Sequence, residues 1–340
     1  MTSVQISPPL QQTCRGEVLR DRVAEWESCE RALATAGVRL PLPHRAIWRL
    51  ARRSSEPLFL ALRTSDGRCA GGFGIHAAPS RAFPGFRVLR LTVEVFSRAA
   101  QTRAGIAELL QQAGFVRAAT TRNWGTTFAL DLQPSEDELF GSFSPTVRRA
   151  IRSVAKLPVQ VRSIDDRRSA SRLDALSSEA FARTGARYQE MWDWEGVIEL
   201  SRRAPDASRL VGLVRTDREG PEALLGFVWG WWNGESVSYF AGASSRPSDL
   251  QGVGIVHPLF WDLIVWAKRT GATWFDLGGA TAGTAGSGDP LGGISEFKRR
   301  FSTQTVDVAE DWVLEPHAVP ARVAALVSTG AAWLRRVTRR

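Results

Sequence analysis

The chain has 340 residues, of which 44% are hydrophobic and 23% charged, and its net charge is +9. This length exceeds one ordinary hydrophobic core and predicts two globular domains of about 150 residues each, while no apolar run reaches the roughly 20 residues that a membrane-spanning helix requires. The positive charge favours anionic partners such as phosphates, nucleic acid or a membrane surface, although an arginine-rich genome would produce the same composition.

The placement of cysteine and histidine argues against disulfide and metal chemistry. Cys14, Cys29 and Cys69 form no Cys-x-x-Cys pair, and residues 1–17 lack the basic start and apolar stretch of a secretory signal. A cytoplasmic location is therefore expected. The four histidines match no metal-ligand spacing, and no Gly-x-Ser-x-Gly or Gly-x-x-x-x-Gly-Lys-Ser/Thr motif is present. Neither a metal site nor a serine nucleophile nor a P-loop is expected.

The first half of the chain predicts two helices, then strands, then a third helix. Apolar residues at three-and-four spacing predict helices over residues 21–37 and 41–53, and a glycine closes the first of them. Alternating apolar residues predict a strand over 86–96, and a helical pattern follows over 103–115.

The second half repeats this order. Its predicted elements are helices over 166–185 and 192–203, strands over 224–232 and 236–244, a helix over 257–271 and a buried strand over 273–279. Three short pieces of 51–73 (ARR, LRT, GGF) recur in 201–227 as SRR, VRT and LGF, at offsets of 150, 152 and 154 residues. Such a recurrence indicates an internal duplication with small loop insertions.

Each half therefore reads helix, helix, strands, helix, strand. This order is the layout of an acyltransferase domain of the GNAT type, in which a splayed pair of central strands admits the acyl donor. We predict an α/β fold with a mixed α+β sheet, made of two tandem GNAT-like domains. The expected segments are 1–133 for the first domain, 134–160 for connecting helices, 161–316 for the catalytic second domain and 317–340 for a basic amphipathic helix. That last helix either packs on the second domain or touches an anionic membrane surface.

Four segments carry a resemblance to a known family: SPTVRRAIRSVAK (144–156), SYFAGAS (238–244), TWFDLGG (273–279) and GGISEFKRRFS (292–302). Their order and spacing resemble the Fem-type transferases, tandem-GNAT proteins that move an amino acid from aminoacyl-tRNA onto the side-chain amine of a peptidoglycan precursor. The resemblance implies an N-acyltransferase of cell-wall biosynthesis. Ser302 stands where the family usually has glycine.

Lys298 lies between Phe297 and Phe301, in a chain with only two other lysines. Attack of an amine on an ester or thioester needs no enzyme nucleophile, but the tetrahedral intermediate carries a negative oxygen. An ammonium is a compact point charge that suits this oxygen, and flanking aromatic rings exclude water. We predict that Lys298 stabilises the oxyanion and that Phe297 contacts substrate; a solvated lysine at a polar edge is the alternative.

Asp276 and Tyr239 are the other candidates in the second half. Asp276 ends a buried strand and opens a glycine-rich loop. It is expected either to orient or deprotonate the attacking amine, or to cap the amides of the loop. Tyr239, one of two tyrosines in the chain, lies where the resemblance places substrate contacts; a core aromatic is the alternative.

A helix over 144–156 carries a cationic stripe. Ser144 is suited to cap this helix and Pro145 to occupy its first turn. At about 100° per residue, Arg148, Arg149 and Arg152 fall on one arc. Such a stripe suits a diphosphate or an RNA backbone, whereas a solvated helix face is the alternative.

The acyl donor has two candidates, and no other cofactor is expected. Aminoacyl-tRNA follows from the resemblance and fits the positive charge. Acyl-CoA would require Gln251 to Gly254 to hold its pyrophosphate at a helix N-terminus, and Val256 places a branched side chain where GNAT proteins have a small residue. The acceptor would be a small-molecule or lipid-linked amine. A non-catalytic anion-binding scaffold is a third hypothesis.

Overall fold

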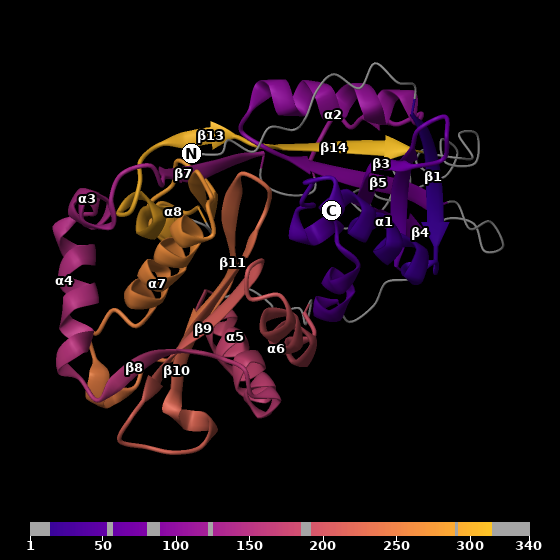
Figure 1. The fold of residues 1–340 in the computed structure, drawn as a ribbon. Coiled ribbons are helices and arrows are strands. Elements are labelled where there is room, and N and C mark those ends of the chain that lie inside the picture. The colour runs from indigo at the N-terminus through magenta and orange to yellow at the C-terminus, as the bar shows by residue number, and fades with distance from the viewer. Residues whose placement is uncertain are drawn as a thin grey trace, which may run out of the picture. The chain divides into compact units, whose positions relative to one another are not determined.

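The computed structural model describes residues 14–52, 57–79, 89–121, 125–184, 192–289 and 292–314. They belong to two compact units. The larger, called here the large unit, takes Arg39–Ser54 and Asn123–Val308; the small unit takes Gln5–Val38, Ser55–Arg122 and Ala309–Arg340. Figure 1 shows the helices and strands of both.

The small unit contains two antiparallel sheets and two helices. Its sheets have the strand orders β1-β2-β3 and β4-β5-β14-β6. The elements are β1 (Arg15–Arg20), α1 (Val23–Thr35), β2 (Leu58–Arg63), β3 (Cys69–Gly74), β4 (His76–Pro79), β5 (Leu89–Phe96), α2 (Ala100–Gln112), β6 (Val116–Arg117) and β14 (Ala309–Leu314).

The large unit is built on one seven-stranded mixed sheet with the order β13-β7-β12-β11-β10-β9-β8. Its strands are β7 (Thr126–Asp131), β8 (Val159–Ser163), β9 (Ser208–Arg215), β10 (Leu224–Trp232), β11 (Ser236–Ser244), β12 (Trp274–Gly279) and β13 (Thr305–Asp307). Its helices are α3 (Glu136–Ser142), α4 (Pro145–Ser153), α5 (Ala170–Thr184), α6 (Trp194–Arg203), α7 (Val256–Arg269) and α8 (Gly292–Arg299). All nine residues of β10 are buried, because helices pack on both faces of this strand.

Local capping explains where the connecting helices begin. The Ser135 hydroxyl accepts from the Glu138 amide while the Glu138 carboxylate accepts from the Ser135 amide, and this reciprocal pair starts α3. Ser144 caps α4, and Pro145 occupies its first position, where a missing N–H costs nothing. Two helices are therefore present where a connecting pair is predicted, and both belong to the large unit.

The predicted order of elements is confirmed in both halves, except that the strands β1 and β8 precede it and that one predicted helix is wrong. In place of the α-helix predicted over 41–53, the described residues 41–52 form two 3-10 helices, Leu42–His44 and Ala46–Ala51. Arg45, between the two, has an extended backbone (φ −91°, ψ 148°) that interrupts any continuous helix. Of the strand expected over 86–96, the described part is Leu89–Phe96.

The two halves of the sequence exchange strands. β7 belongs to the first half of the chain but pairs with β12 and β13 in the large unit, whereas β14 at the far end of the chain pairs with β5 and β6 in the small unit. The compact units therefore differ from the expected segments 1–133 and 161–316. Neither exchange follows from local pattern, because strand pairing depends on which distant edges meet. The helix expected over 317–340 lies outside the described residues.

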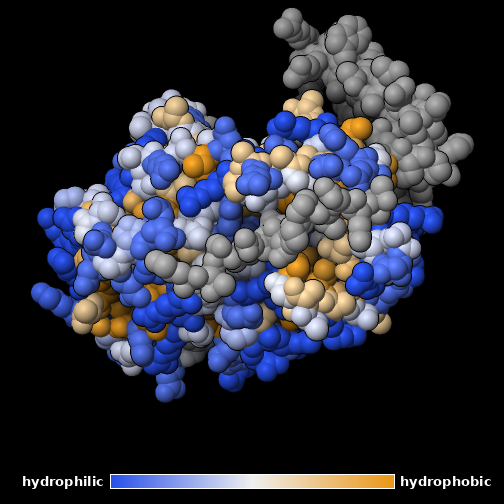
Figure 2. Space-filling view, turned by 45° about the horizontal axis from the view of Figure 1, so that its top comes forward, coloured by the Kyte–Doolittle hydropathy of each residue, from blue (hydrophilic) through white to orange (hydrophobic). Residues whose placement is uncertain are grey.

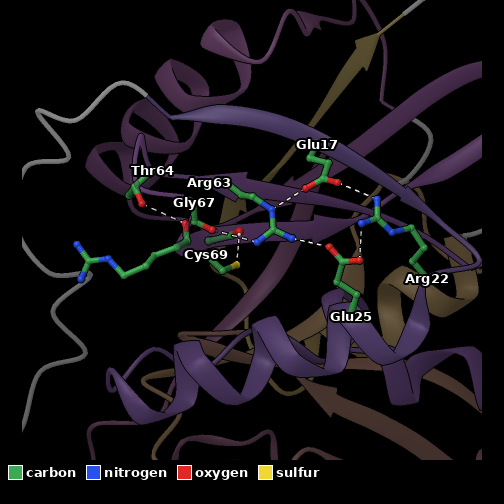
Figure 3. A network of polar contacts seen from close by, with 9 residues as sticks. Glu17, Arg22, Glu25, Arg63, Thr64, Gly67 and Cys69 are labelled. Atoms are coloured by element: carbon green, nitrogen blue, oxygen red, sulfur yellow. Dashed lines mark hydrogen bonds and ion pairs between the residues drawn. The ribbon is translucent and has the colours of Figure 1, made fainter.

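An ion-pair network ties three elements of the small unit together (Figure 3). The Arg63 guanidinium on β2 donates to Glu17 on β1 and to Glu25 on α1, with both N–O distances 2.6 Å. Arg22 bridges the same two carboxylates. Because every side chain is at least a quarter exposed, each pair contributes little stability by itself. The two arginines and two glutamates neutralise one another. The network therefore has a structural role, which is to join β1, β2 and α1.

The described helices include none that is long and apolar enough to cross a membrane. On the face drawn in Figure 2, hydrophilic residues cover most of the coloured surface and hydrophobic ones gather in small patches.

Candidate active site

An interrupted pair of parallel strands lies at the centre of the large unit. β11 and β12 pair only from Ser236 to Ser238 on one strand and from Trp274 to Asp276 on the other. β11 continues for six residues beyond this ladder without β12 beside it. The predicted splayed pair of central strands is therefore present in this unit.

The corresponding place in the small unit is filled. β14 lies between β5 and β6 and pairs with β5 from Leu91 to Phe96, so an unbroken antiparallel ladder occupies this position. Among the described residues, only the large unit therefore has the opening that an acyl group requires.

A backbone bulge shapes β12 at the point where the opening begins. Against β7, Asp276 is paired with Ala129 and Gly279 with Thr127, so β12 carries one extra residue. The bulge includes Gly278, whose φ of +83° is a conformation that other residues adopt only with strain. Its amide donates to the Asp276 carboxylate at 2.7 Å.

The side chain of Lys298, on α8, reaches the bulge at Gly278 and Gly279. Its side chain is buried, with 7% exposed, and its Nζ donates to the Gly279 carbonyl at 3.0 Å. A Cβ on Gly278 would lie 3.0 Å from this Nζ and 3.7 Å from the carbonyl oxygen of Tyr239 on β11. The ammonium therefore sits where β11 and β12 separate.

The surroundings of Lys298 lower the pKa of its ammonium group. Burial lowers the pKa of Lys298 to about 8, although the nearby carboxylate of Asp276 partly opposes this effect. A solvated lysine at a polar edge is thus not what the structure shows. The group is a desolvated cation that is still largely protonated at neutral pH.

Asp276 is fully enclosed beneath the bulge. Burial raises the pKa of its carboxyl group, while hydrogen bonds from Thr127 and Gly278, the nearby Ser238 hydroxyl and the charge of Lys298 oppose this. Asp276 thus caps a loop amide, as one hypothesis expected, and its charge interacts with that of the candidate catalytic cation. The contact of Thr127 with Asp276 could not be predicted from the sequence, because Thr127 lies 149 residues before Asp276 and belongs to no motif.

The phenylalanines beside Lys298 pack on other aromatic rings. Phe297 contacts Phe260 and His257, with ring centroids 5.2 Å apart in both cases, and Phe301 lies 5.2 Å from Phe143. These contacts hold α8 and the residues after it against α7 and against the residue that ends α3.

Tyr239 faces α7. Its ring lies 4.4 Å from that of Phe260, and burial raises the pKa of its hydroxyl to about 12. The hydroxyl occupies space beside Gly242, where a Cβ would come within 3.0 Å of it. The neighbouring Phe240 instead joins a tryptophan cluster around Trp231. Alternate residues of β11 therefore line different faces of the sheet.

The three candidate arginines of α4 have different environments. Arg148 donates to the carbonyl oxygens of Gly141 and Phe143, both at 2.6 Å, and thus closes the end of α3. Arg148 is half-buried and its guanidinium is already bonded to these backbone oxygens, which distinguishes it from the other two arginines of the predicted arc. Arg149 and Arg152 are exposed, and Arg152 also lies 5.1 Å above the Phe140 ring.

The turn from Gln251 to Gly254 precedes α7 as a pyrophosphate loop would. However, the amides of Val253, Ile255 and His257 donate to carbonyl oxygens within residues 250–254. A Cβ on Gly254 would lie 2.9 Å from the Ala150 Cβ, so α4 packs directly on the turn. These three amides are therefore not available to a pyrophosphate. No group of three or more candidate metal ligands occurs among the described residues.

Comparison with known proteins identifies the domain that contains these residues. Residues 141–299, which extend from the end of α3 through α8, match the family model described as an acetyltransferase (GNAT) domain. No curated protein matches the sequence.

Solved structures are similar over most of the chain. The crystal structure of FemX matches with a TM-score of 0.59 and 13% identity, covering 88% of this chain and 97% of that one. The structure of L-PGS from Bacillus licheniformis matches with a TM-score of 0.44 and 14% identity (92% and 97% covered), and a tandem GNAT protein from the clavulanic acid biosynthesis pathway with 0.43 and 14% (88% and 98%). Residues 141–299 are thus a GNAT domain, and the protein is an acyltransferase with a fold similar to that of FemX.

Proposed function

We propose that the protein transfers an aminoacyl group from aminoacyl-tRNA to an amine of a peptidoglycan-precursor-like acceptor. The observation that carries this proposal is the buried ammonium of Lys298 at the opening between β11 and β12. A fixed cation at this place supports the chemistry of acyl transfer. The similarity to Fem-type proteins supports the aminoacyl donor and the cell-wall acceptor.

The reaction would proceed without a covalent enzyme intermediate. The acceptor nitrogen forms a bond to the acyl carbon, the carbonyl oxygen becomes negative, and the ester bond to the tRNA ribose then breaks. The proton lost by the amine goes to the departing ribose oxygen, and Asp276 would orient or relay it. Lys298 donates one N–H to Gly279, and its two other N–H groups are suited to bind the oxyanion.

This role of Lys298 predicts a loss of rate at alkaline pH. Because burial places the pKa of Lys298 near 8, below its usual 10.5, the ammonium loses its proton as pH rises through about 8. The single-turnover rate should then fall about tenfold per pH unit above the midpoint, since only the protonated form stabilises the oxyanion. Single-turnover rates measured from pH 6 to 10 would show this limb, and circular dichroism at each pH controls for unfolding. A rate that stays constant up to pH 10 contradicts the role.

The surroundings of α4 favour tRNA over acyl-CoA as donor. Arg149 and Arg152 offer exposed positive charge on the helix that covers the Gln251–Gly254 turn. In the turn the Val253 amide is bonded to Leu250, and the amides of Ile255 and His257 just after it are bonded back to the turn. Acyl-CoA remains the second candidate, because Gly252, at φ +78°, shapes a tight turn directly before a 14-residue helix.

The donor is tested by binding. Arg149→Ala and Arg152→Ala should each weaken binding of deacylated tRNA and lower the slope of log affinity against log salt by roughly one, as expected for one lost phosphate contact. Arg148→Ala is the matched control, because this guanidinium already bonds Gly141 and Phe143. It should lower the melting temperature and leave the salt slope unchanged. Salt-insensitive binding of acetyl-CoA without tRNA binding would favour the second candidate.

A product assay completes the test. Charged total tRNA and a pool of cell-wall precursors should give an aminoacylated precursor that mass spectrometry detects and that RNase treatment abolishes.

A further inference from the structure

A strand from the first half of the chain reaches the candidate active site. Thr127 on β7 is buried, with 2% exposed, and its hydroxyl donates to Oδ1 of Asp276. The same oxygen accepts the Gly278 amide at 2.7 Å. One side-chain donor and one backbone donor thus fix this carboxylate under the β12 bulge.

The same strand also holds the segment that follows Lys298. The Ser302 hydroxyl donates to the Ala129 carbonyl at 2.6 Å, and the Ala129 amide donates to Gln304 at 2.9 Å. Ala129 is also the partner of Asp276 in the ladder between β7 and β12. Two residues of β7 therefore set the positions of both the carboxylate and the end of α8.

We propose that Thr127 is a positioning residue that holds the Asp276 carboxylate under the β12 bulge in its ionised form, and thereby keeps Lys298 charged. A buried carboxylate needs donors to remain ionised, and Thr127 supplies the side-chain donor from the neighbouring strand. Without this hydroxyl, Asp276 holds its proton more tightly. Lys298 then loses the negative charge that opposes its desolvation.

The other titratable groups around the pair do not replace this donor. Tyr239 of β11 packs its ring on Phe260, and His257 of α7 bonds its own turn at Gly254. Glu296 on α8 bonds the Ala285 amide. On β7, the adjacent Thr126 is exposed and donates to Asp307 instead, at 2.7 Å. Thr126 is therefore a matched control on the same strand.

The test measures the ionisation of Lys298 directly. The chain has only three lysines, so lysine labelled with carbon-13 at Cε gives three NMR signals, and Lys298→Met identifies the relevant one. In Thr127→Val the protonation constant of Lys298 should fall by roughly threefold or more relative to wild type. Thr127→Ser and Thr126→Val should keep the wild-type value. Thr127→Ala is measured in parallel, so that the result does not depend on one variant folding.

The catalytic consequence rests on the proposed function and has its own readout. In Thr127→Val the alkaline limb of the single-turnover rate should move to lower pH, and Thr127→Ser should restore it. An unchanged Lys298 midpoint in the folded Val and Ala variants overturns the inference. A shifted midpoint with an unshifted rate limb supports the positioning role and contradicts the proposed role of Lys298.

Discussion

Replacement of Lys298 by methionine is expected to lower the rate of acyl transfer about 10²–10³-fold, the usual effect of removing one oxyanion donor. Methionine keeps the length and apolar stem of lysine but offers no positive charge or N–H. Since the ammonium is desolvated at the opening between β11 and β12, no solvent ion replaces it efficiently. The measurement is kcat and kcat/KM with the donor and acceptor found in the product assay.

Two further lysine variants control for charge and packing. Lys298→Arg should restore little activity, because a planar guanidinium does not fit beside Gly278, whose Cβ position lies 3.0 Å from Nζ. Lys268→Met removes the hydrogen bonds to the carbonyls of Leu132 and Pro134, both 2.8 Å, and should lower stability with little effect on rate. Full activity in folded Lys298→Met would show that the oxyanion is bound elsewhere.

Replacement of Gly278 by alanine should lower kcat about tenfold or more and destabilise the protein by about 1–2 kcal/mol. The destabilisation follows from φ +83°, where a Cβ meets the backbone. The loss of rate follows from the new methyl group, which would lie 3.0 Å from the Lys298 Nζ and displace the ammonium. A displacement of about 1 Å in a catalytic group costs up to 10²-fold in rate.

Gly286 separates these two effects. It has nearly the same backbone angle, φ +81°, but a Cβ there meets no atom within 4 Å. Gly286→Ala should therefore show the strain without the loss of rate. The comparison uses melting temperatures and single-turnover rates of both variants. Equal rates in the two variants would mean that the space beside Lys298 is not critical.

Much of the large unit could be predicted because its signals are local. Ser144 and Pro145 mark the start of α4, and the alternation of 236–244 marks β11. Lys298 was found from a short motif and from the scarcity of lysine. In the structure the Lys268 ammonium also donates to three successive carbonyl oxygens, those of residues 132–134. The planar guanidinium of an arginine would fit this arrangement poorly. Scarcity therefore indicates a need for a compact cation rather than catalysis itself.

The remaining features depend on contacts between residues far apart in the chain. A helical wheel places Arg148 on a cationic arc, but it cannot show that two carbonyls of the preceding helix end capture the guanidinium. The role of Thr127 cannot be predicted from the sequence for the same reason, because the pairing of β7 with β12 brings it to Asp276. Sequence patterns predict elements more readily than the edges at which those elements meet.

The exchanged strands also bear on how the chain folds as it is synthesised. Domains usually fold in order from the N-terminus as they leave the ribosome. Here the small unit receives β14 only when Ala309–Leu314 has been made, and until then β5 lacks the partner that covers its edge. The last strand of the large unit, β13, ends at Asp307 and is therefore synthesised before β14. The half of the protein translated first is therefore the half completed last, and its open strand edge is exposed to aggregation in the nascent chain.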